Sequence, residues 1–157
     1  SRPIFSDAAA AVMLEKSETN KIGPFIFKTS GDGGDFLTVK NGNKELYMDG
    51  PAVLKFSLNL VPEATHELLE KANCKKEDID TFIFHQASAV VLNKLKKKLD
   101  ILDLQWFNQI ENIGNTVSAT IPIAISILQN ENKFSYSKKY LLMGFGVGLS
   151  VAGCIIS

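Results

Sequence analysis

The stretch that decides the fold is DTFIFHQAS, residues 80–88. Its core, Thr81–Phe84, is a short run of bulky residues, typical of a strand that is buried on both faces. A helix is predicted directly after it, from about Ser88 to Leu99, because apolar residues recur there at helical spacing. The apolar side carries Val91, Leu92, Leu95 and Leu99, and the other side carries Lys94, Lys96, Lys97 and Lys98. A buried strand that leads into a helix indicates the α/β class.

Upstream of this stretch, residues 57–73 are predicted to form another amphipathic helix. Pro62 suits its first turn, and Asn73 can close it in the left-handed conformation. The region before it is harder to assign. Val12–Leu14 favours a strand over a helix, although four alanines precede it, and residues 17–50 carry so many turn signals that we expect an irregular surface excursion with short strands.

Downstream, the alternation of strands and helices continues. Trp106–Asn108 is predicted to be a short strand, and a helix is predicted to run to about Leu128 with Thr116 or Ser118 as its cap. Strands are then predicted over 140–143 and 149–156, joined through the glycine-rich stretch Gly144–Gly148. The sum is an α/β domain with a mixed or mostly parallel sheet, largely buried and covered by helices.

Composition excludes several classes of protein. The 157 residues have the size of one ordinary domain, with 45% hydrophobic and 22% charged residues, and equal numbers of acidic and basic side chains give a net charge of zero. This balance points to neither a nucleic acid nor an acidic membrane as partner. The apolar stretch Leu141–Ile156 is broken by glycines, which argues against a membrane helix. Cys74 and Cys154 form no metal or CxxC spacing, so we expect no metal and a reduced, cytoplasmic setting.

Three features are candidates for chemistry. His85 lies where a buried strand ends and a helix begins, which is where sites gather in α/β folds, although a histidine held there for structure is the alternative. Asn115, in Gly114–Thr116, is either a turn residue or a site residue. Gly144–Gly148 is followed by a strand and not a helix, so it indicates a close backbone approach and not a phosphate loop. His66 lies among charged residues, which favours a structural interpretation.

Four blocks together resemble the β-ketoacyl-ACP synthase III family of thiolase-like condensing enzymes. Residues 80–88 resemble the family's strand ending in HQAN, and residues 112–122, NIGNTVSATIP, resemble its GNTSAASIP block. Residues 144–150, GFGVGLS, resemble its closing GFGGGLTW, and residues 5–14, FSDAAAAVML, resemble its FGDGAGAVVL strand. The likeness covers Phe5 to Ile156, weakly through the excursion and closely after Val61, and corresponds to the carboxy-terminal half of the family's fold, with 1–157 as one domain.

The resemblance implies a decarboxylative condensation of acyl-CoA with malonyl-ACP in fatty-acid synthesis, without a cofactor. His85 and Asn115 match the family's catalytic histidine and asparagine, two neutral donors that can stabilise an enolate oxygen. The same matching places Gln86, Phe145, Gly146 and Gly148 against the substrate. Lys94 and Lys97 are candidates for docking an acidic carrier protein, with a solvated helix face as the equal alternative.

Departures from the family pattern also matter. Ser88 replaces the last residue of HQAN, Val90 stands where an arginine is common, and Val147 stands where the family has glycine. Neither cysteine matches the family's nucleophile, so the chain alone is expected to be inactive. Together with the start at Ser1, this suggests an excised half of a longer enzyme, which by the family's habit forms a homodimer. The alternatives are a related acyl-transfer or condensing enzyme of specialised metabolism, and a non-catalytic thiolase-fold subunit.

Overall fold

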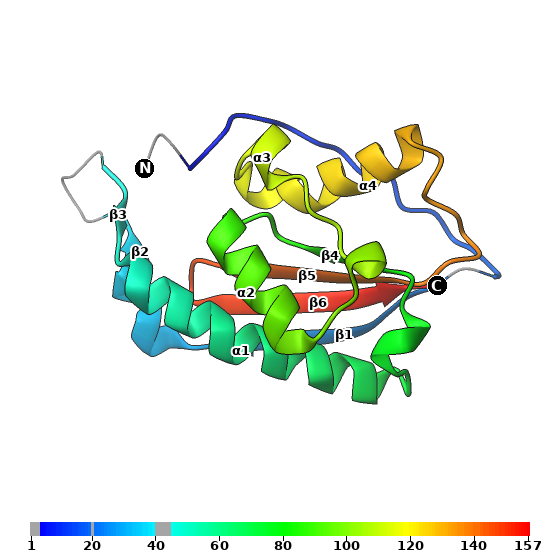
Figure 1. The fold of residues 1–157 in the computed structure, drawn as a ribbon, viewed down its shortest axis with the longest axis horizontal. Helices are drawn as coiled ribbons and strands as arrows, with labels where there is room; N and C mark the ends of the chain where they lie inside the picture. The colour runs from blue at the N-terminus through cyan, green and yellow to red at the C-terminus, as the bar shows by residue number, and fades with distance from the viewer. Residues whose placement is uncertain (1–3, 20, 40–44) are drawn as a thin grey trace.

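A four-stranded sheet forms the centre of the computed structural model, which describes residues 4–19, 21–39 and 45–157 (Figure 1). The strand order is β1-β6-β5-β4. Its strands are β1 Ile22–Thr29, β4 Thr81–Phe84, β5 Tyr140–Gly146 and β6 Ser150–Ile156. β4 pairs with β5 in parallel, whereas β5 with β6 and β6 with β1 pair in antiparallel fashion. The expected mixed sheet is therefore confirmed, and the mostly parallel alternative is wrong.

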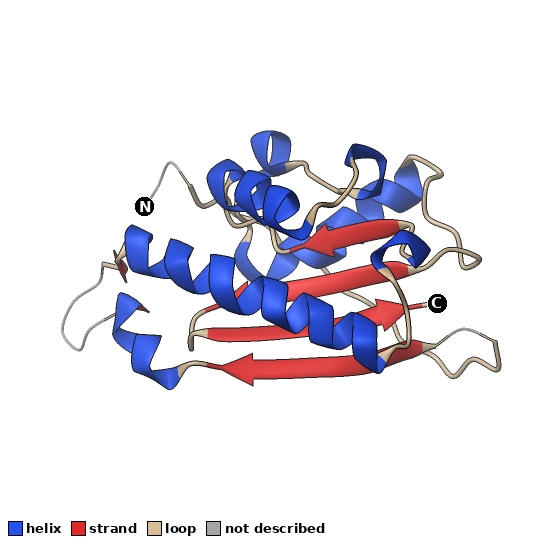
Figure 2. Ribbon diagram, turned by 60° about the horizontal axis from the view of Figure 1, so that its bottom comes forward, coloured by secondary structure: helices blue, strands red, loops and turns tan. Residues whose placement is uncertain are grey.

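Helices cover both faces of this sheet (Figure 2). α1 Gly50–Lys71 and α2 Ala89–Leu99 pack on one face, where Phe82 and Phe84 belong to the larger core. Ile83 points the other way, into a second core with α4 Thr120–Asn130. This alternation follows from the two-residue period of a strand, and it explains why every residue of Phe82–Phe84 is apolar.

The unit of β4 and α2 forms as predicted. Ser88 caps α2, since its hydroxyl accepts a hydrogen bond from the Val91 N–H at 3.3 Å. Asp100 ends the helix in the left-handed conformation, with φ of 51°. Leu92 and Leu95 are fully buried against the sheet and α1. His85 is thereby held at a rigid joint between a buried strand and a capped helix.

α1 begins earlier than predicted, at Gly50, where the Asp49 side chain accepts from the Ala52 N–H at 3.0 Å. The prediction that Pro62 lies in the first turn is wrong, because Pro62 lies inside the helix. A proline there leaves the carbonyl four residues earlier, that of Leu58, without its helical donor. The ammonium group of Lys98 on α2 donates to this carbonyl at 2.6 Å. Asn73 follows the helix with φ of 51°, as predicted.

The amino-terminal third differs most from expectation. The predicted strand over Val12–Leu14 is wrong: the segment is extended, exposed and unpaired, and Met13 is 87% exposed. A strand requires a neighbour for its backbone groups, and none of the described strands lies beside this segment. Residues 17–50 hold more structure than expected, because β1 is an eight-residue edge strand of the main sheet. Leu37–Thr38 (β2) and Tyr47–Met48 (β3) form a small separate pair. One of the turn signals expected within 17–50, Asn41–Asn43, lies outside the described residues.

The segment between α2 and α4 is a chain of turns. Trp106 makes a single bridge to Phe82 and no longer strand, contrary to prediction. A short helix, α3 Ile110–Ile113, and a 3-10 turn over Val117–Ala119 follow. Neither Thr116 nor Ser118 caps α4 through its side chain. The 3-10 turn before α4 already pairs the backbone N–H groups there, since the Ala119 N–H donates to the Thr116 carbonyl at 3.1 Å and the Thr120 N–H donates to the Val117 carbonyl. The strands predicted over 140–143 and 149–156 are confirmed as β5 and β6, with β5 extending to Gly146.

Within the described ranges, no helix is both long and apolar enough to cross a membrane.

Candidate functional site

His85 lies directly beyond β4. Its backbone N–H donates to the Met143 carbonyl at 2.8 Å, which continues the parallel pairing with β5 by one residue. Its ring meets Phe145 edge to face, with centroids 5.3 Å apart. On another side, Nδ1 lies 2.7 Å from the Thr120 hydroxyl at the start of α4. Two strands and one helix therefore fix the position and orientation of the imidazole.

The surroundings of His85 keep the ring neutral. Burial lowers the pKa of His85 from 6.5 to about 4, since a charged imidazolium loses hydration there, and the nearby Val117 carbonyl opposes this effect only in part. A neutral imidazole carries one N–H and one lone pair, so it can both donate and accept a hydrogen bond near pH 7.

Asn115 is the second side chain of the site, and it is 6% exposed. Gly114 precedes it with φ of 66°, and a Cβ at that position would collide with the Ser6 side chain. The amide oxygen of Asn115 accepts from the Val117 N–H at 2.9 Å, and its Nδ2 donates to the Ala87 carbonyl at 3.1 Å. These two bonds fix the amide orientation and use one of the two N–H groups of Nδ2. The second N–H is left as a donor.

A cavity of about 660 Å³ brings His85 and Asn115 together. Its walls are largely apolar and come from elements far apart in the sequence. The lining includes Ile4 and Phe5, Leu37, Leu46 and Met48, the start of α1 (Gly50, Val53, Leu54, Phe56 and Ser57), Ala87, Ser88, Val90 and Val91, Val117, Ser118, Thr120 and Ile121, and Gly144, Phe145, Gly146 and Val147. Two neutral donors at the edge of an apolar cavity suit a ligand that is apolar in the main and has an oxygen to be recognised.

The predicted substrate-binding residues divide into two pairs. Phe145 and Gly146 line the cavity, as expected for a site residue. Gln86 does not: it is fully buried, its Nε2 donates to the Phe84 carbonyl at 2.8 Å and its Oε1 accepts from the Gln109 N–H at 3.0 Å. Gly148, with φ of 144°, shapes the turn between β5 and β6 and is not part of the wall. The structure thus gives Gln86 and Gly148 supporting positions behind the site.

Two residues that the sequence did not single out are central. Val117 donates its N–H to Asn115, while its carbonyl accepts the backbone N–H of Thr120 and lies 3.0 Å from the Thr120 hydroxyl oxygen. Val117 has φ of 53°, a strained conformation for a β-branched residue. The one signal for Val117 and Thr120 in the sequence was their place in the 112–122 block. A threonine such as Thr120 at the start of a helix suggests a cap and not a contact with His85. The apolar wall from Leu37 to Phe56 had no signal, because it lies in and beside the irregular excursion.

Neither cysteine belongs to this site. Cys154 lies on β6, and burial raises the pKa of its thiol, which makes it a weak nucleophile. Cys74 follows α1 and accepts from the Lys139 ammonium at 3.4 Å, away from the cavity. His66 is exposed on α1. The described residues contain no cluster of three or more His, Cys, Asp or Glu side chains suited to a metal ion.

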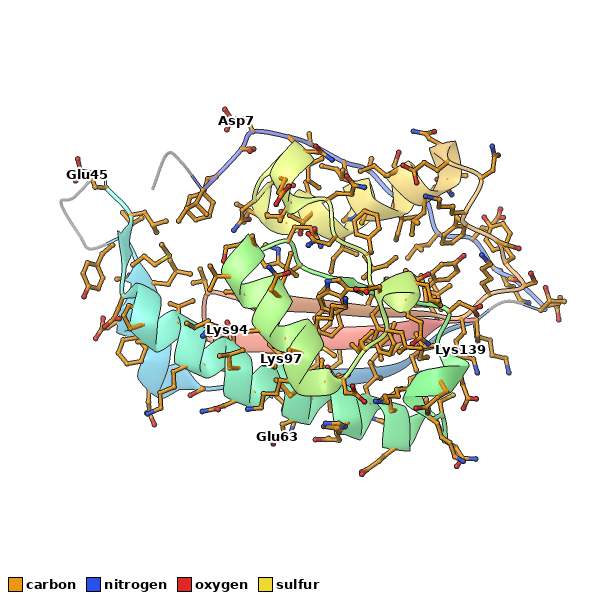
Figure 3. The ribbon with its side chains drawn as sticks, viewed as in Figure 1. Asp7, Glu45, Glu63, Lys94, Lys97 and Lys139 are labelled. Carbon is orange, nitrogen blue, oxygen red and sulfur yellow. The ribbon has the colours of Figure 1, made fainter. Side chains whose placement is uncertain are left out.

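The lysines of α2 have different environments (Figure 3). Lys94 and Lys97 are exposed and project from α2. Lys96 forms an ion pair with Asp103, and Lys98 is bonded to the Leu58 carbonyl. Lys94 and Lys97 are therefore available to an acidic partner, whereas Lys96 and Lys98 serve the fold.

Comparisons with known proteins identify the family and the fold. Residues 69–157 match the family model described as 3-oxoacyl-[acyl-carrier-protein (ACP)] synthase III C terminal. A beta-ketoacyl-[acyl-carrier-protein] synthase III of Listeria monocytogenes is 31% identical over 154 residues, which are 98% of this chain and 49% of the relative. A crystal structure of a 3-oxoacyl-(acyl-carrier-protein) synthase III is 34% identical with a TM-score of 0.86, covering 99% of this chain and 53% of that one. That of Aquifex aeolicus is 28% identical with a TM-score of 0.84, covering 90% and 46%. The chain spans about half the length of the curated relatives it matches.

Proposed function

The chain belongs to the 3-oxoacyl-[acyl-carrier-protein] synthase III family, and from this premise we propose that it supplies the His–Asn half of a decarboxylating condensing site. The reaction is the condensation of acyl-CoA with malonyl-ACP in fatty-acid synthesis. The observation that carries the proposal is the convergence of His85 and Asn115 on one apolar cavity, with the second N–H of the Asn115 amide left as a donor.

The chemistry follows from where charge develops. Loss of CO₂ from a malonyl thioester leaves an enolate, whose oxygen carries the new negative charge. His85 and Asn115 donate to that oxygen, and in a water-poor cavity two fixed donors stabilise it without reorganisation. The enolate carbon then attacks the acyl thioester and the thiolate departs. No step requires a metal or a cofactor from this chain.

The acylated thiol belongs to a second half of the enzyme in this proposal, because neither Cys74 nor Cys154 lines the cavity. The docking face in this proposal is open: on the sheet face that α4 shares, Phe25 and Phe27 of β1 are exposed, Phe27 by 73%. Val12–Leu14 adds further exposed apolar surface. We propose that a cysteine-bearing half covers this surface, and that the whole enzyme is a cytoplasmic homodimer.

The test is condensation by the chain joined to its cysteine-bearing half, with acyl-CoA and malonyl-ACP as substrates. His85→Ala and Asn115→Ala are each expected to lower kcat by on the order of 100- to 1000-fold. His66→Ala, on the exposed side of α1, is the matched control and keeps full activity. Wild-type activity in both site variants would refute the assignment.

Carrier-protein docking is assigned to Lys94 and Lys97. Replacing both by glutamate is expected to raise the KM for malonyl-ACP and leave kcat unchanged, because rim charges act on encounter and not on chemistry. Lys138→Glu is the control, because Lys138 precedes Lys139 in the sequence and Figure 3 shows Lys139 to the right of Lys94 and Lys97, away from α2. An unchanged KM in the double variant would show that these lysines form a solvated helix face and do not dock the carrier protein.

A related condensing enzyme of specialised metabolism is the second candidate. Val147, 68% exposed on the wall of the cavity, stands where the family resemblance expects glycine, and in this second proposal its larger side chain reshapes the space for an acyl chain. Comparison of short and branched acyl-CoA primers separates the two candidates. A non-catalytic subunit would show no condensation with any primer.

A further inference from the structure

His85 can serve as a donor only if its proton is on the nitrogen that faces the substrate. Nδ1 is turned to Thr120, so the remaining nitrogen, Nε2, is the one left for a ligand in the cavity. In a neutral imidazole, the hydrogen bond made by one nitrogen decides whether the other carries the proton. The hydrogen-bond partner of Nδ1 therefore determines whether Nε2 presents a donor or a lone pair to the cavity.

That partner is ambiguous by nature, because a hydroxyl can donate or accept. The Thr120 oxygen lies 2.7 Å from Nδ1 and 3.0 Å from the Val117 carbonyl oxygen, and it has one proton for two acceptors. If the proton goes to Val117, Nδ1–H must donate to Thr120, and Nε2 presents a lone pair. If it goes to Nδ1, Nε2 carries the proton and presents a donor.

We propose that Thr120 is the positioning residue of the site, donating its hydroxyl proton to Nδ1 and thereby holding His85 as the Nε2–H tautomer. The Val117 carbonyl does not depend on the hydroxyl, because it already accepts the backbone N–H of Thr120. The contact to Nδ1 is also the shorter of the two. The functional consequence rests on the proposed function, since an enolate oxygen requires a donor and would be repelled by a lone pair.

The inference extends to a specific variant. Thr120→Val retains the shape of this buried side chain and removes the hydroxyl. The adjacent polar group is then the Val117 carbonyl, which can only accept. The ring is expected to turn its proton toward that carbonyl, giving the Nδ1–H tautomer. Thr120→Ser keeps a hydroxyl and is expected to keep the wild-type tautomer.

The test is a ¹H–¹⁵N correlation spectrum of the chain labelled with ¹⁵N-histidine, at neutral pH. The chain has two histidines, so exposed His66 serves as an internal reference. We expect Nε2–H for His85 in the wild type and in Thr120→Ser, and Nδ1–H in Thr120→Val. An Nδ1–H signal in the wild type, or an unchanged tautomer in Thr120→Val, overturns the inference. If Thr120→Val does not fold, an Nδ1–H signal in the wild type or in Thr120→Ser still overturns the inference.

Activity of the intact enzyme provides the second readout. Thr120→Val is expected to lower kcat by on the order of 100-fold, the cost of one lost donor, with little change in the KM for malonyl-ACP. Thr120→Ser is expected to restore kcat. If the spectra behave as stated but the wild-type enzyme does not condense its substrates, the positioning role stands and the proposed function fails. If kcat is unaffected by Thr120→Val despite a changed tautomer, the role of Nε2–H in catalysis is overturned.

Discussion

Acidification tests the environment of His85 in the folded chain. Burial lowers the pKa of His85 from 6.5 to about 4. Between pH 6.5 and pH 4, His85 is therefore mostly protonated in the unfolded chain and mostly neutral in the folded chain. Because the unfolded state binds more protons in this window, the free energy of unfolding falls as the pH falls. Below pH 4 both states are protonated, and this contribution levels off.

The magnitude follows from the two pKa values. Between pH 7.5 and pH 5, the free energy of unfolding is expected to fall by about 2 kcal/mol through His85 alone. The total loss on full protonation is about 3 kcal/mol. Asp100 does not interfere, because Lys76 holds the pKa of its carboxyl below 3.8, outside this window.

Urea unfolding at a series of pH values measures this effect, with fluorescence of the chain's single tryptophan, Trp106, as the probe. Trp106 packs against Phe84, with ring centroids 4.9 Å apart, and so reports on the core beside the site. His85→Gln is expected to abolish most of the pH dependence, whereas His66→Gln is expected to retain it. Equal unfolding free energies at pH 7.5 and pH 5 in the wild type, or an undiminished dependence in His85→Gln, would refute the reasoning.

Three further predictions concern stability. Gln86→Met fills a similar volume but removes the hydrogen bonds to Phe84 and Gln109, so we expect the free energy of unfolding in urea to fall by about 2–4 kcal/mol. A stable variant with a raised KM would instead show that Gln86 contacts the substrate. Lys98→Met deprives the Leu58 carbonyl of its donor beside Pro62 and is expected to cost about 1 kcal/mol, seen as a lower urea midpoint; Lys97→Met, on the exposed side of α2, is the control and should match the wild type. Val117→Asn is expected to raise the free energy of unfolding by about 1 kcal/mol, because asparagine tolerates positive φ better than a β-branched residue; a lower midpoint would show that the valine side chain has a packing role.

The parts of the fold that depend on local sequence could be predicted. β4 and α2 followed from a bulky run and helical periodicity, all within twenty residues. The start of α1 was missed because Pro62 looked like a first-turn residue, and only a lysine from another helix makes its interior position acceptable. Val12–Leu14 shows the converse: a strand-forming composition does not supply a strand's partner.

The same distinction applies to the site. His85 and Asn115 could be proposed from short blocks of sequence, because one directly follows a buried strand and the other lies in a glycine-containing polar stretch before a helix. Thr120 could not, since its role comes from a contact with a residue 35 positions away. Gln86 was predicted to contact the substrate because it adjoins His85 in the sequence, whereas in the structure its side chain bonds to the Phe84 carbonyl and the Gln109 N–H.

The hydrogen bonds made by Val117 have a consequence for how this site can diversify. Its peptide N–H donates to the Asn115 amide oxygen, and its peptide carbonyl contacts Thr120, the residue proposed to orient His85. Its side chain is 58% exposed on the cavity wall. The chemistry is thus supported by main-chain atoms that every non-proline amino acid possesses. Position 117 can therefore accept other side chains that tolerate a positive φ, and such exchanges offer natural selection or a protein engineer a route to new ligand preferences that leaves the proposed donors in place.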